Sequence, residues 1–541
     1  MSATAHVDTF ARDNLPPREL RPEFRFDLPQ LRYPARTNCA GELLDRMAMK
    51  AGGRIFIRTP DGQCTYAQFM AQANRIAHVL VKDMGLVPGN RVLLRGYNNP
   101  MMAACWFAVI KAGGIVVATM PLLRAKELTD IVTKAQVSHA LCDRRLDAEL
   151  KAALPACPTL KTIRYWYDDA SDSLDARCAK QPIDFRNVDT AADDVALIAF
   201  TSGTTGKPKG TMHFHRDVVG ICDLFPRSIL RTSRDDIFCG TPPFAFTFGL
   251  GVLLVFPMRY GASTVLVERY TPELLLDTIR TFRASVCFTA PTFYRQMAGL
   301  ANNYDLSSLK KCVSAGEALP DATRQLFKSA TGIELIDAIG STEMLNIFIS
   351  HTPERVRRGA TGYAIPGYRA TVLDENGRRC ARNVVGQLAV QGPTGCRYLA
   401  DERQKDYVIA EGEMRGWTLT GDAYSMDADG YFYYQSRIDD MIISTGYNIA
   451  GAEVEGALLA HPAVAECGVV GVPNEERGQI VKAFVVLRPG YAKDAAMVNQ
   501  LQDHVKNTIA PYKYPRAIEF RDVLPRTETG KLQRFKLRTQ P

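Results

Sequence analysis

Short apolar segments alternate with amphipathic segments along most of this chain. Runs such as Arg91–Arg95, Ile115–Thr119 and Val195–Phe200 have the length and apolar content of buried strands. Between such runs lie stretches with helical periodicity, among them Tyr66–Asp83 and Thr271–Phe282. Strands that alternate with helices form βαβ units, so the sequence predicts an α/β fold of stacked βαβ subdomains.

The chain length and a change of pattern near residue 435 predict the domains. A chain of 541 residues is long enough for at least two domains. After the aromatic segment Asp427–Tyr434 come the polar residues Arg437–Asp440, and then two predicted helices and two predicted strands at Ala452–His461, Ala465–Val472, Lys482–Leu487 and Asp494–Thr508. We predict a large N-terminal domain over 1–436, a hinge over 437–440 and a small, mobile α+β domain over 441–541.

Composition and charge exclude several classes of protein. Hydrophobic residues make up 46% and charged residues 23% of the chain, which is ordinary for a soluble globular protein and excludes a disordered, collagen-like or coiled-coil chain. The 66 Lys and Arg against 58 Asp and Glu leave a net charge of +8, too small for a dedicated nucleic-acid binder. The 13 cysteines form no CxxC pair, so we expect reduced thiols and a cytoplasmic location.

The stretch Ile237–Met258 is uncharged over 22 residues, which is long enough to span a bilayer. It contains three prolines and three glycines, so we predict buried strand, turn and helix pieces instead of a membrane span. The N-terminus has no apolar targeting segment. We expect no membrane partner and no nucleic-acid partner. The oligomeric state stays open, with a homodimer as one option.

The C-terminal residues 506–541 hold nine Lys and Arg against three acidic residues. One interpretation of this basic tail is a solvated surface. The other is a binding surface for a ligand that carries several phosphates.

The segment Thr201-Ser202-Gly203-Thr204-Thr205-Gly206-Lys207-Pro208-Lys209-Gly210 directly follows a predicted strand. Its three glycines, four hydroxyls and two lysines suit a loop that wraps a polyphosphate, because many donors can approach where no Cβ intervenes. It is not a Walker A loop, since Thr201 stands where that motif has glycine and Pro208 follows Lys207.

This loop resembles the phosphate-binding signature of the acyl-adenylate-forming superfamily, which includes acyl- and aryl-CoA ligases, adenylation domains and luciferases. Four more segments resemble the family's motifs in the same order, namely Gly340-Ser341-Thr342-Glu343, Thr420-Gly421-Asp422, Arg437-Ile438-Asp439-Asp440 and Pro525–Lys531. The resemblance implies a large adenylate-forming domain followed by a small mobile domain. It also implies ATP, Mg²⁺ and the co-substrate coenzyme A.

The resemblance assigns roles to residues around ATP. Thr342 would donate to the attacked phosphate, Glu343 would bind Mg²⁺, and Lys531 would be the catalytic cation that stabilises charge at phosphorus. Asp422 and Arg437 would contact the ribose. The remaining ATP-binding residues would be Thr201, Ser202, Gly203, Thr204, Thr205, Gly206, Lys207, Gly316, Glu317, Asp337, Ala338, Ile339, Gly340 and Ser341. Taken singly, Glu343, Asp422 and Lys531 are more typical of a surface acid, a turn-capping aspartate and a solvated lysine, so their roles depend on the resemblance.

The resemblance also places a hinge at Asp439, where the small domain would pivot between an adenylate-forming and a thioester-forming arrangement. Ser444, Thr445, Gly446 and Tyr447 resemble the segment that the family brings to the pantetheine arm of coenzyme A.

The acid pocket is predicted from an aromatic tract. Phe246 falls at the family's carboxylate gate, and Ala290, Tyr294 and Gly340 would complete the walls. The phenyl-rich tract Phe244–Phe248 suits an aromatic acid. Ile339–Phe348 resembles benzoate-CoA ligases except at Asn346, where His is usual. Phe246–Gly251 and Ser444–Ile449 resemble 2-aminobenzoate-CoA ligases more closely, so the resemblance favours a ring with an ortho amino or hydroxyl group.

We therefore predict an ATP-dependent aryl-CoA ligase that adenylates benzoate or 2-aminobenzoate and transfers the acyl group to coenzyme A, with AMP and pyrophosphate released. The alternatives are a carrier-protein-loading adenylation enzyme, a fatty acyl-CoA ligase, a luciferase-like oxygenase and a non-catalytic ligand sensor.

Overall fold

The computed structural model describes residues 3–539 apart from 202–207, 445–446, 475–476 and 527–531. Its described strands form four sheets. The first sheet has six strands in the order β6-β5-β3-β4-β7-β8, all parallel except β8. Its strands are β3 (Arg91–Arg95), β4 (Ile115–Thr119), β5 (His139–Asp143), β6 (Thr162–Trp166), β7 (Val195–Thr201) and β8 (Lys209–Phe214).

The second sheet has nine strands in the order β15-β14-β13-β12-β11-β9-β10-β1-β2. The six central strands from β13 to β1 are parallel to one another. The strands are β1 (Ile55–Thr59), β2 (Gly62–Thr65), β9 (Ile237–Gly240), β10 (Ser263–Val265), β11 (Val286–Thr289), β12 (Lys311–Ala315), β13 (Leu335–Gly340), β14 (Ile347–Ser350) and β15 (Tyr363–Ala364).

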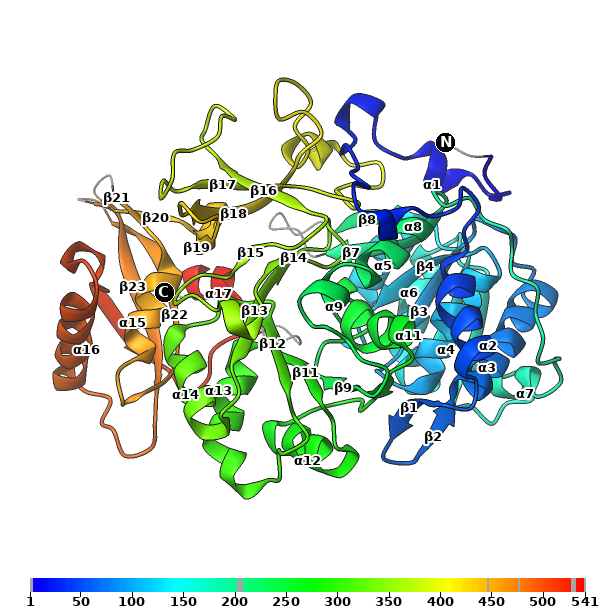
Figure 1. Cartoon of the computed structure of the whole chain (residues 1–541), viewed down its shortest axis with the longest axis horizontal. Helices are drawn as coiled ribbons and strands as arrows, with labels where there is room; N and C mark the ends of the chain where they lie inside the picture. Colours follow the sequence, from blue (N-terminus) through cyan, green and yellow to red (C-terminus); the bar gives the residue numbers. More distant parts are fainter. Residues whose placement is uncertain (1–2, 202–207, 445–446, 475–476, 527–531, 540–541) are drawn as a thin grey trace.

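Helices connect and cover these two sheets (Figure 1). The longer ones are α3 (Tyr66–His78), α4 (Pro100–Lys111), α5 (Ala125–Ala135), α6 (Asp147–Ala153), α8 (His215–Cys222), α12 (Pro272–Phe282), α13 (Pro291–Leu300) and α14 (Asp321–Thr331). The shorter ones are α1 (Phe10–Asp13), α2 (Arg46–Ala51), α7 (Leu174–Cys178), α9 (Phe225–Ser228), α10 (Thr247–Leu250) and α11 (Phe256–Tyr260).

Local sequence signals explain where helices begin and end. Thr65 and Gln68 form a capping box at the start of α3, which continues as a π-helical turn over Val79–Asp83. Thr271 caps α12, and Pro272 occupies its first turn, where the missing N–H costs nothing. The predicted helices at Tyr66–Asp83 and Thr271–Phe282 are therefore present.

The third sheet is an antiparallel sheet of four strands, β16 (Arg369–Leu373), β17 (Gly386–Gln391), β18 (Thr418–Met426) and β19 (Phe432–Arg437). The fourth contains only strands that follow residue 441, namely β20 (Ile442–Ser444), β21 (Tyr447–Ile449), β22 (Val464–Asn474), β23 (Gly478–Leu487) and β24 (Ala517–Phe520). With α15 (Gly451–Leu459), α16 (Ala495–Thr508) and α17 (Arg534–Thr539), this sheet makes a small C-terminal domain.

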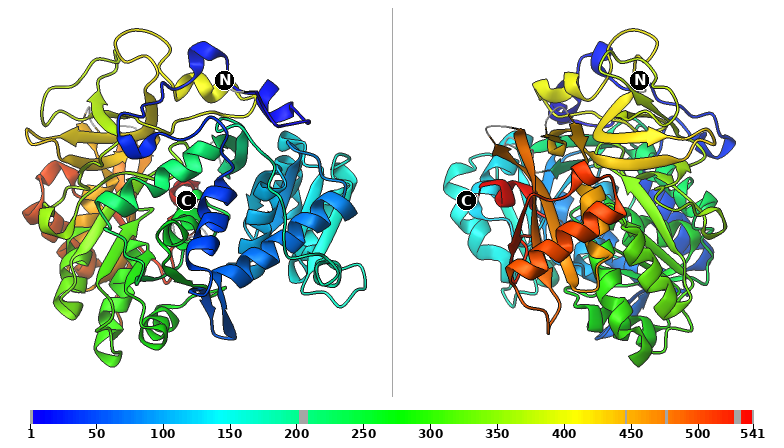
Figure 2. Two further views of the ribbon diagram at one scale, coloured as in Figure 1. Left: turned by 45° about the vertical axis from the view of Figure 1, so that its right-hand side comes forward. Right: turned by 90° about the vertical axis from the view of Figure 1, so that its left-hand side faces the viewer.

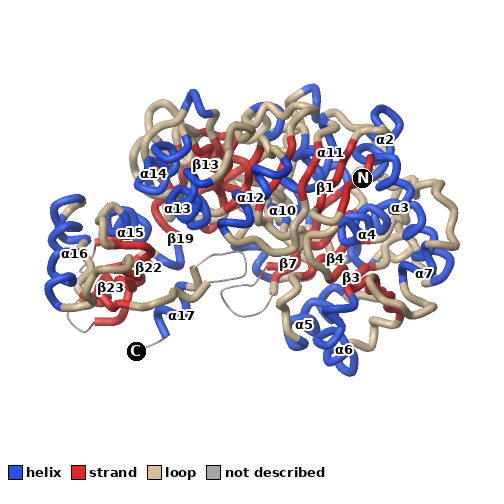
Figure 3. Tube along the Cα trace, turned by 90° about the horizontal axis from the view of Figure 1, so that it is seen from below, coloured by secondary structure: helices blue, strands red, loops and turns tan. Residues whose placement is uncertain are grey.

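The small domain lies at one end of the molecule (Figure 3), where α15 is next to α14 of the large domain. α16 covers one face of its sheet, as the right-hand view of Figure 2 shows. The small domain has a hydrophobic core of its own that includes Ile442, Val454, Val485 and Leu501. The predicted fold class, a large α/β domain followed by a small α+β domain, is confirmed.

The uncharged stretch Ile237–Met258 divides as predicted into β9, α10, a π-helical turn and the first residues of α11. In the part of the chain that the structure describes, no helix has the length and hydropathy needed to span a bilayer.

Candidate active site

A cavity of about 740 Å³ lies at the carboxyl edge of the nine-stranded sheet. Residues at or just after the carboxyl ends of five parallel strands line it. Gly340 ends β13, and Gly316, Ala290, Thr241 and Val267 follow β12, β11, β9 and β10 respectively. In α/β sheets, the crevice outside the carboxyl ends of the strands is where ligands bind. The location of the cavity therefore identifies it as the candidate active site.

Several predicted residues line this cavity. Phe246, Ala290 and Gly340, three of the residues predicted to bind the acid, are in its wall. Of the predicted ATP-binding residues, Thr201, Gly316, Ser341 and Thr342 also line it.

Tyr294 does not line the cavity, so its assignment to the acid pocket is wrong. Its side chain is fully buried, and its hydroxyl donates to the carbonyl oxygens of Cys287 (2.8 Å) and Val313 (3.2 Å). Its ring packs against Phe327 of α14 in a buried hydrophobic cluster. The preceding residue, Phe293, lines the cavity instead.

Other lining residues were not predicted from the sequence. They follow β3, β4 and β10 and include Tyr97, Asn98, Leu122, Glu268 and Arg269. Asn98 joins the walls, since its amide donates to the Pro242 carbonyl (2.9 Å) and accepts from the Phe244 N–H (2.8 Å). The sequence could have indicated these residues, because they follow strands that the sequence predicts and residues at the carboxyl ends of parallel strands line such cavities.

Hydrogen bonds to neighbouring residues hold the turn that carries Thr342 and Glu343. His213 of β8 contacts the Thr342 carbonyl oxygen through Nε2 at 2.8 Å, and its side chain is fully buried. Ser341 accepts the Met344 N–H at 3.2 Å, and Leu345 takes a left-handed backbone conformation with φ of 67°. These contacts orient Glu343 before any ligand arrives.

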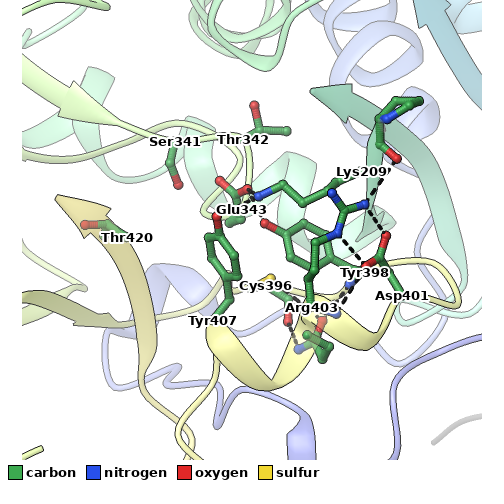
Figure 4. Close-up of polar contacts among 12 residues, drawn as sticks. Lys209, Ser341, Thr342, Glu343, Cys396, Tyr398, Asp401, Arg403, Tyr407 and Thr420 are labelled. Atoms are coloured by element: carbon green, nitrogen blue, oxygen red, sulfur yellow. Dashed lines mark hydrogen bonds and ion pairs between the residues drawn. The ribbon is translucent and has the colours of Figure 1, made fainter. Parts of the chain in front are cut away.

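A network of three further residues surrounds the Glu343 carboxylate (Figure 4). The Tyr398 hydroxyl donates to Oε1 of Glu343 at 2.5 Å. The Lys209 ammonium lies 4.0 Å from the same oxygen and donates to the Tyr407 hydroxyl at 2.7 Å. It also lies 4.0 Å from the centre of the Tyr407 ring and 4.9 Å from that of Tyr398, which are cation–π distances. Tyr398 and Tyr407 have no sequence signal, because they are more than 50 residues from Glu343.

The donor set around Glu343 fits Mg²⁺. Among the described residues, no group of three His, Cys, Asp or Glu side chains could form a dedicated metal cage. Mg²⁺ is usually held by one or two carboxylates together with substrate phosphates, and the single, mostly buried carboxylate of Glu343 suits that arrangement.

Asp422 and Arg437 are brought together by strand pairing, because they are direct partners in the antiparallel register of β18 and β19. Nη1 of Arg437 donates to Asp422 Oδ1 (3.1 Å) and to the Thr420 carbonyl (2.9 Å). Burial raises the pKa of Asp422, and the Arg437 charge opposes that rise. Gly421 has a φ of 76°, and a Cβ there would lie 2.6 Å from Arg437 Nη2, so only glycine fits this turn.

Asp337, Ala338 and Ile339 belong to β13 and lie outside the cavity wall. Asp337 Oδ1 accepts the Ala338 N–H at 3.0 Å. Burial raises the pKa of Asp337 to about 7, against the opposing charge of Arg324.

Glu317 contacts the small domain. Its Oε1 accepts from Arg526 Nη1 (3.4 Å) and from the Leu532 N–H (3.0 Å), and its Oε2 accepts from the Thr292 hydroxyl (3.3 Å). Arg526 and Leu532 also pair with each other as an antiparallel bridge. Lys531 itself lies outside the described residues, as do 202–207, Thr445 and Gly446.

The predicted hinge residue Asp439 belongs to a 3₁₀ turn, Ile438–Asp440, between β19 and β20. Of the predicted coenzyme A segment, Ser444 ends β20 and is buried, and Tyr447 begins β21.

Acidic side chains of the small domain pair with much of the basic tail. Lys513 binds Glu453 (2.6 Å), Arg534 binds Glu455 (2.8 Å) and Arg526 binds Glu466 (3.1 Å). These pairs favour a structural explanation for the tail's charge over a phosphate-binding surface.

Two protein-family models match the sequence of this chain. Residues 44–398 match the model of the AMP-binding enzyme, and residues 453–531 match that of the AMP-binding enzyme C-terminal domain. The chain belongs to the AMP-binding enzyme family. The superfamily predicted from the five motifs is thereby confirmed.

Several of the similar proteins are acid–CoA ligases. Benzoate–CoA ligase of Thauera aromatica is 36% identical over 94% of this chain and 97% of its own. The anthranilate CoA ligase AuaEII, solved with anthranoyl-AMP, superposes with a TM-score of 0.89 at 32% identity, covering 94% of this chain and 98% of its own. A benzoate CoA ligase of Burkholderia xenovorans LB400 gives a TM-score of 0.85 at 30% identity, over 93% of this chain and all of its own.

Proposed function

We propose that this protein is an ATP-dependent aryl-CoA ligase. It adenylates benzoate, 2-aminobenzoate or a similar small aromatic acid, releases pyrophosphate, and transfers the acyl group to coenzyme A with release of AMP. The observation that carries this proposal is one continuous cavity that joins an aromatic pocket to the Thr342–Glu343 turn. Its similarity to benzoate and anthranilate CoA ligases supports the same chemistry.

The acid pocket suits a flat ring. Phe246, Phe248 and Phe293 supply aromatic walls, which favour edge-to-face or offset contacts with an aryl group. Ala290 and Gly340 keep the space between them open. A Cβ on Gly340 would lie 2.6 Å from the Asn346 carbonyl oxygen, so glycine is required at this close approach.

Asn346 lines this pocket, and each polar atom of its amide makes a hydrogen bond to the protein. Its Nδ2 donates to the Thr247 carbonyl (3.0 Å), and its Oδ1 accepts the Ile347 N–H (2.9 Å). The Nδ2 bond joins two segments of the wall, whereas the Oδ1 bond is local to the turn. A substituted ring therefore meets a pocket of fixed shape at this position.

On the ATP side, the glycine-rich loop 201–207 and Ser341 would cradle the phosphates, and Asp422 with Arg437 would bind the ribose hydroxyls. Glu343 would hold Mg²⁺, which supplies positive charge at the phosphates when bound. Thr342 and Lys531 would stabilise the charge that develops at the α-phosphorus as the carboxylate attacks.

The small domain would pivot at Asp439 between the two half-reactions, with residues 1–436 and 441–541 as the moving bodies. Arg526 and Leu532, which flank the segment of Lys531, both contact Glu317 beside the cavity-lining residue Gly316. These contacts support an arrangement suited to adenylation. In the other arrangement, Ser444, Thr445, Gly446 and Tyr447 would approach the pantetheine arm.

The test is thioester formation from ATP, coenzyme A and a panel of acids, namely benzoate, 2-aminobenzoate, salicylate and octanoate. We expect the aromatic acids to give higher kcat/KM than octanoate. A tenfold preference for octanoate would favour a fatty acyl-CoA ligase. Pyrophosphate release with no coenzyme A thioester would favour a carrier-loading enzyme.

A further inference from the structure

An arginine of the large domain, Arg295, contacts the small domain through its guanidinium. Arg295 lies in α13, and its Nε donates to the Ala465 carbonyl at 3.2 Å. Its Nη2 donates to the carbonyls of Leu459 (3.1 Å) and Val464 (3.2 Å). All three acceptors belong to the small domain, at the end of α15 and the start of β22. One side chain thus joins the two domains through three main-chain acceptors.

These carbonyls lie where the regular structure of the small domain is interrupted. Leu459 is the last residue of α15, and the last carbonyls of a helix have no partner within that helix. The register between β22 and β23 shifts between Val464 and Glu466, so Ala465 has no partner residue across the ladder. A cation at the C-terminus of a helix is also favoured by the helix dipole. Arg295 therefore supplies donors at positions where the helix and the ladder leave acceptors over.

The guanidinium of Arg295 suits this set of acceptors. It carries five N–H donors in one plane, whereas a lysine ammonium is a compact charge with three donors. Arg295 is partly buried, and burial lowers its pKa, with the nearby charge of Arg488 acting in the same direction. Hydrogen bonds from a charged donor become stronger as water is removed. We therefore expect this contact to contribute more than an exposed ion pair would.

A second contact between the domains lies beside the first, and the cavity lies close to both. Arg526 joins Glu317 of the large domain (3.4 Å) to Glu466 of the small domain (3.1 Å). Phe293, in the first turn of α13, lines the cavity. It is two residues from Arg295, and side chains at that separation point roughly 200° apart around a helix. The same stretch of α13 therefore has the acid pocket on one face and the small domain on the other.

We propose that Arg295 is a positioning residue that holds the small domain in the adenylate-forming arrangement and releases it for thioester formation. The inference rests on the proposed function, in which the small domain brings Lys531 to the phosphates in the first half-reaction only. A pivot at 437–440 would carry residues 459–465 away with the small domain while α13 stays in the large domain, so the three hydrogen bonds would break together. The contact therefore sets the population of the adenylating arrangement.

The experiment measures the two half-reactions separately in Arg295→Met, which keeps the apolar stem and removes the N–H donors. The kcat of acid-dependent pyrophosphate exchange should fall about tenfold or more, because the adenylating arrangement becomes the minor one. The KM values for ATP and acid should stay within about twofold, since Arg295 is not among the residues that line the cavity. Thioester formation from synthetic benzoyl-adenylate and coenzyme A should be unchanged or faster.

Two further variants accompany this one, and circular dichroism checks that each is folded. Arg280→Ala, on the neighbouring helix α12, removes an exposed arginine that pairs with Asp277 of the same helix, and it should change neither half-reaction. Arg295→Lys keeps the charge without the planar fork, so it should recover part of the exchange rate. It also tests the contact if the methionine variant does not fold.

An unchanged exchange rate in Arg295→Met would overturn the proposed role of Arg295 while leaving the ligase function intact. Equal losses in both half-reactions would also overturn it, because they would indicate a general effect on the packing of α13. A loss confined to thioester formation would overturn it by assigning the contact to the other domain arrangement. If the unmodified protein catalyses neither exchange nor thioester formation with any acid of the panel, the proposed function itself fails, and the role of Arg295 with it.

Discussion

The two ends of the cavity hold their side chains by different kinds of contact. At the β13 end, Glu343 accepts a hydrogen bond from the Tyr398 hydroxyl and pairs with the Lys209 ammonium. The His213 contact with the Thr342 carbonyl holds the turn that carries Glu343. In the acid pocket, Phe246, Phe293 and Ala290 form walls by shape alone. Preorganised polar groups stabilise charge that develops in a transition state, whereas an apolar pocket discriminates between substrates by their size. We therefore expect substitutions in the polar network around Glu343 to change the reaction rate, and substitutions in the walls of the acid pocket to change which acid is preferred.

The largest effect is expected from Lys531→Ala. Loss of one preorganised charge at a developing oxyanion typically costs ~10²–10³ in rate. Pyrophosphate release should fall by that factor, while thioester formation from synthetic aryl-adenylate should stay within about tenfold of the unmodified protein. Rapid-quench measurements of each half-reaction check this. Equal losses in both half-reactions would mean that one domain arrangement performs all the chemistry.

Glu343→Gln should give the next largest effect, because it keeps the side-chain shape and removes the charge that would bind Mg²⁺. We expect adenylation to fall by about tenfold or more and to need more magnesium for half-maximal rate. Glu375→Gln, an exposed change in the turn between β16 and β17, is the matched control. The same magnesium dependence in Glu343→Gln and Glu375→Gln would remove Glu343 from the metal site.

The acid pocket should respond to Ala290→Val with a change of specificity. The backbone of Ala290 is extended, with φ of −79° and ψ of 157°, so valine fits the chain and its added methyl groups enter the cavity. The kcat/KM for 2-aminobenzoate should fall about tenfold, while the KM for ATP stays within twofold. Ala381→Val, on an exposed loop, should change neither value. A parallel rise in the KM for ATP would show that the two ends of the cavity are not independent.

Features that depend on residues close together in the sequence could be predicted, and features that depend on residues far apart in the sequence could not. Strands such as β3, β4 and β11 agree with prediction because hydrophobic run length is local, and the Thr342–Glu343 turn was found because its motif is contiguous. Tyr294 was assigned wrongly because adjacent helix residues point about 100° apart, and an aromatic pair does not reveal which ring faces the cavity. Tyr398 reaches Glu343, and Tyr407 reaches Lys209, only through the fold, so no pattern near the motif could indicate them.

The smallest expected effect, that of Tyr407→Phe, is also the most specific test of the polar network. The Tyr407 hydroxyl accepts from Lys209 at 2.7 Å, which holds the ammonium 4.0 Å from Glu343 Oε1. Phenylalanine keeps the ring but removes this acceptor, and a buried ammonium without an acceptor moves to the nearest carboxylate. Lys209 would then compete with Mg²⁺ for Glu343. We expect the magnesium concentration for half-maximal pyrophosphate exchange to rise severalfold, with the rate at saturating magnesium nearly unchanged. Tyr431→Phe, which removes a hydroxyl that donates to the Arg355 carbonyl, is the matched control. A loss of rate at every magnesium concentration would instead mean that Tyr407 only supports the local packing, and Lys209 would not be acting on the metal site through Glu343.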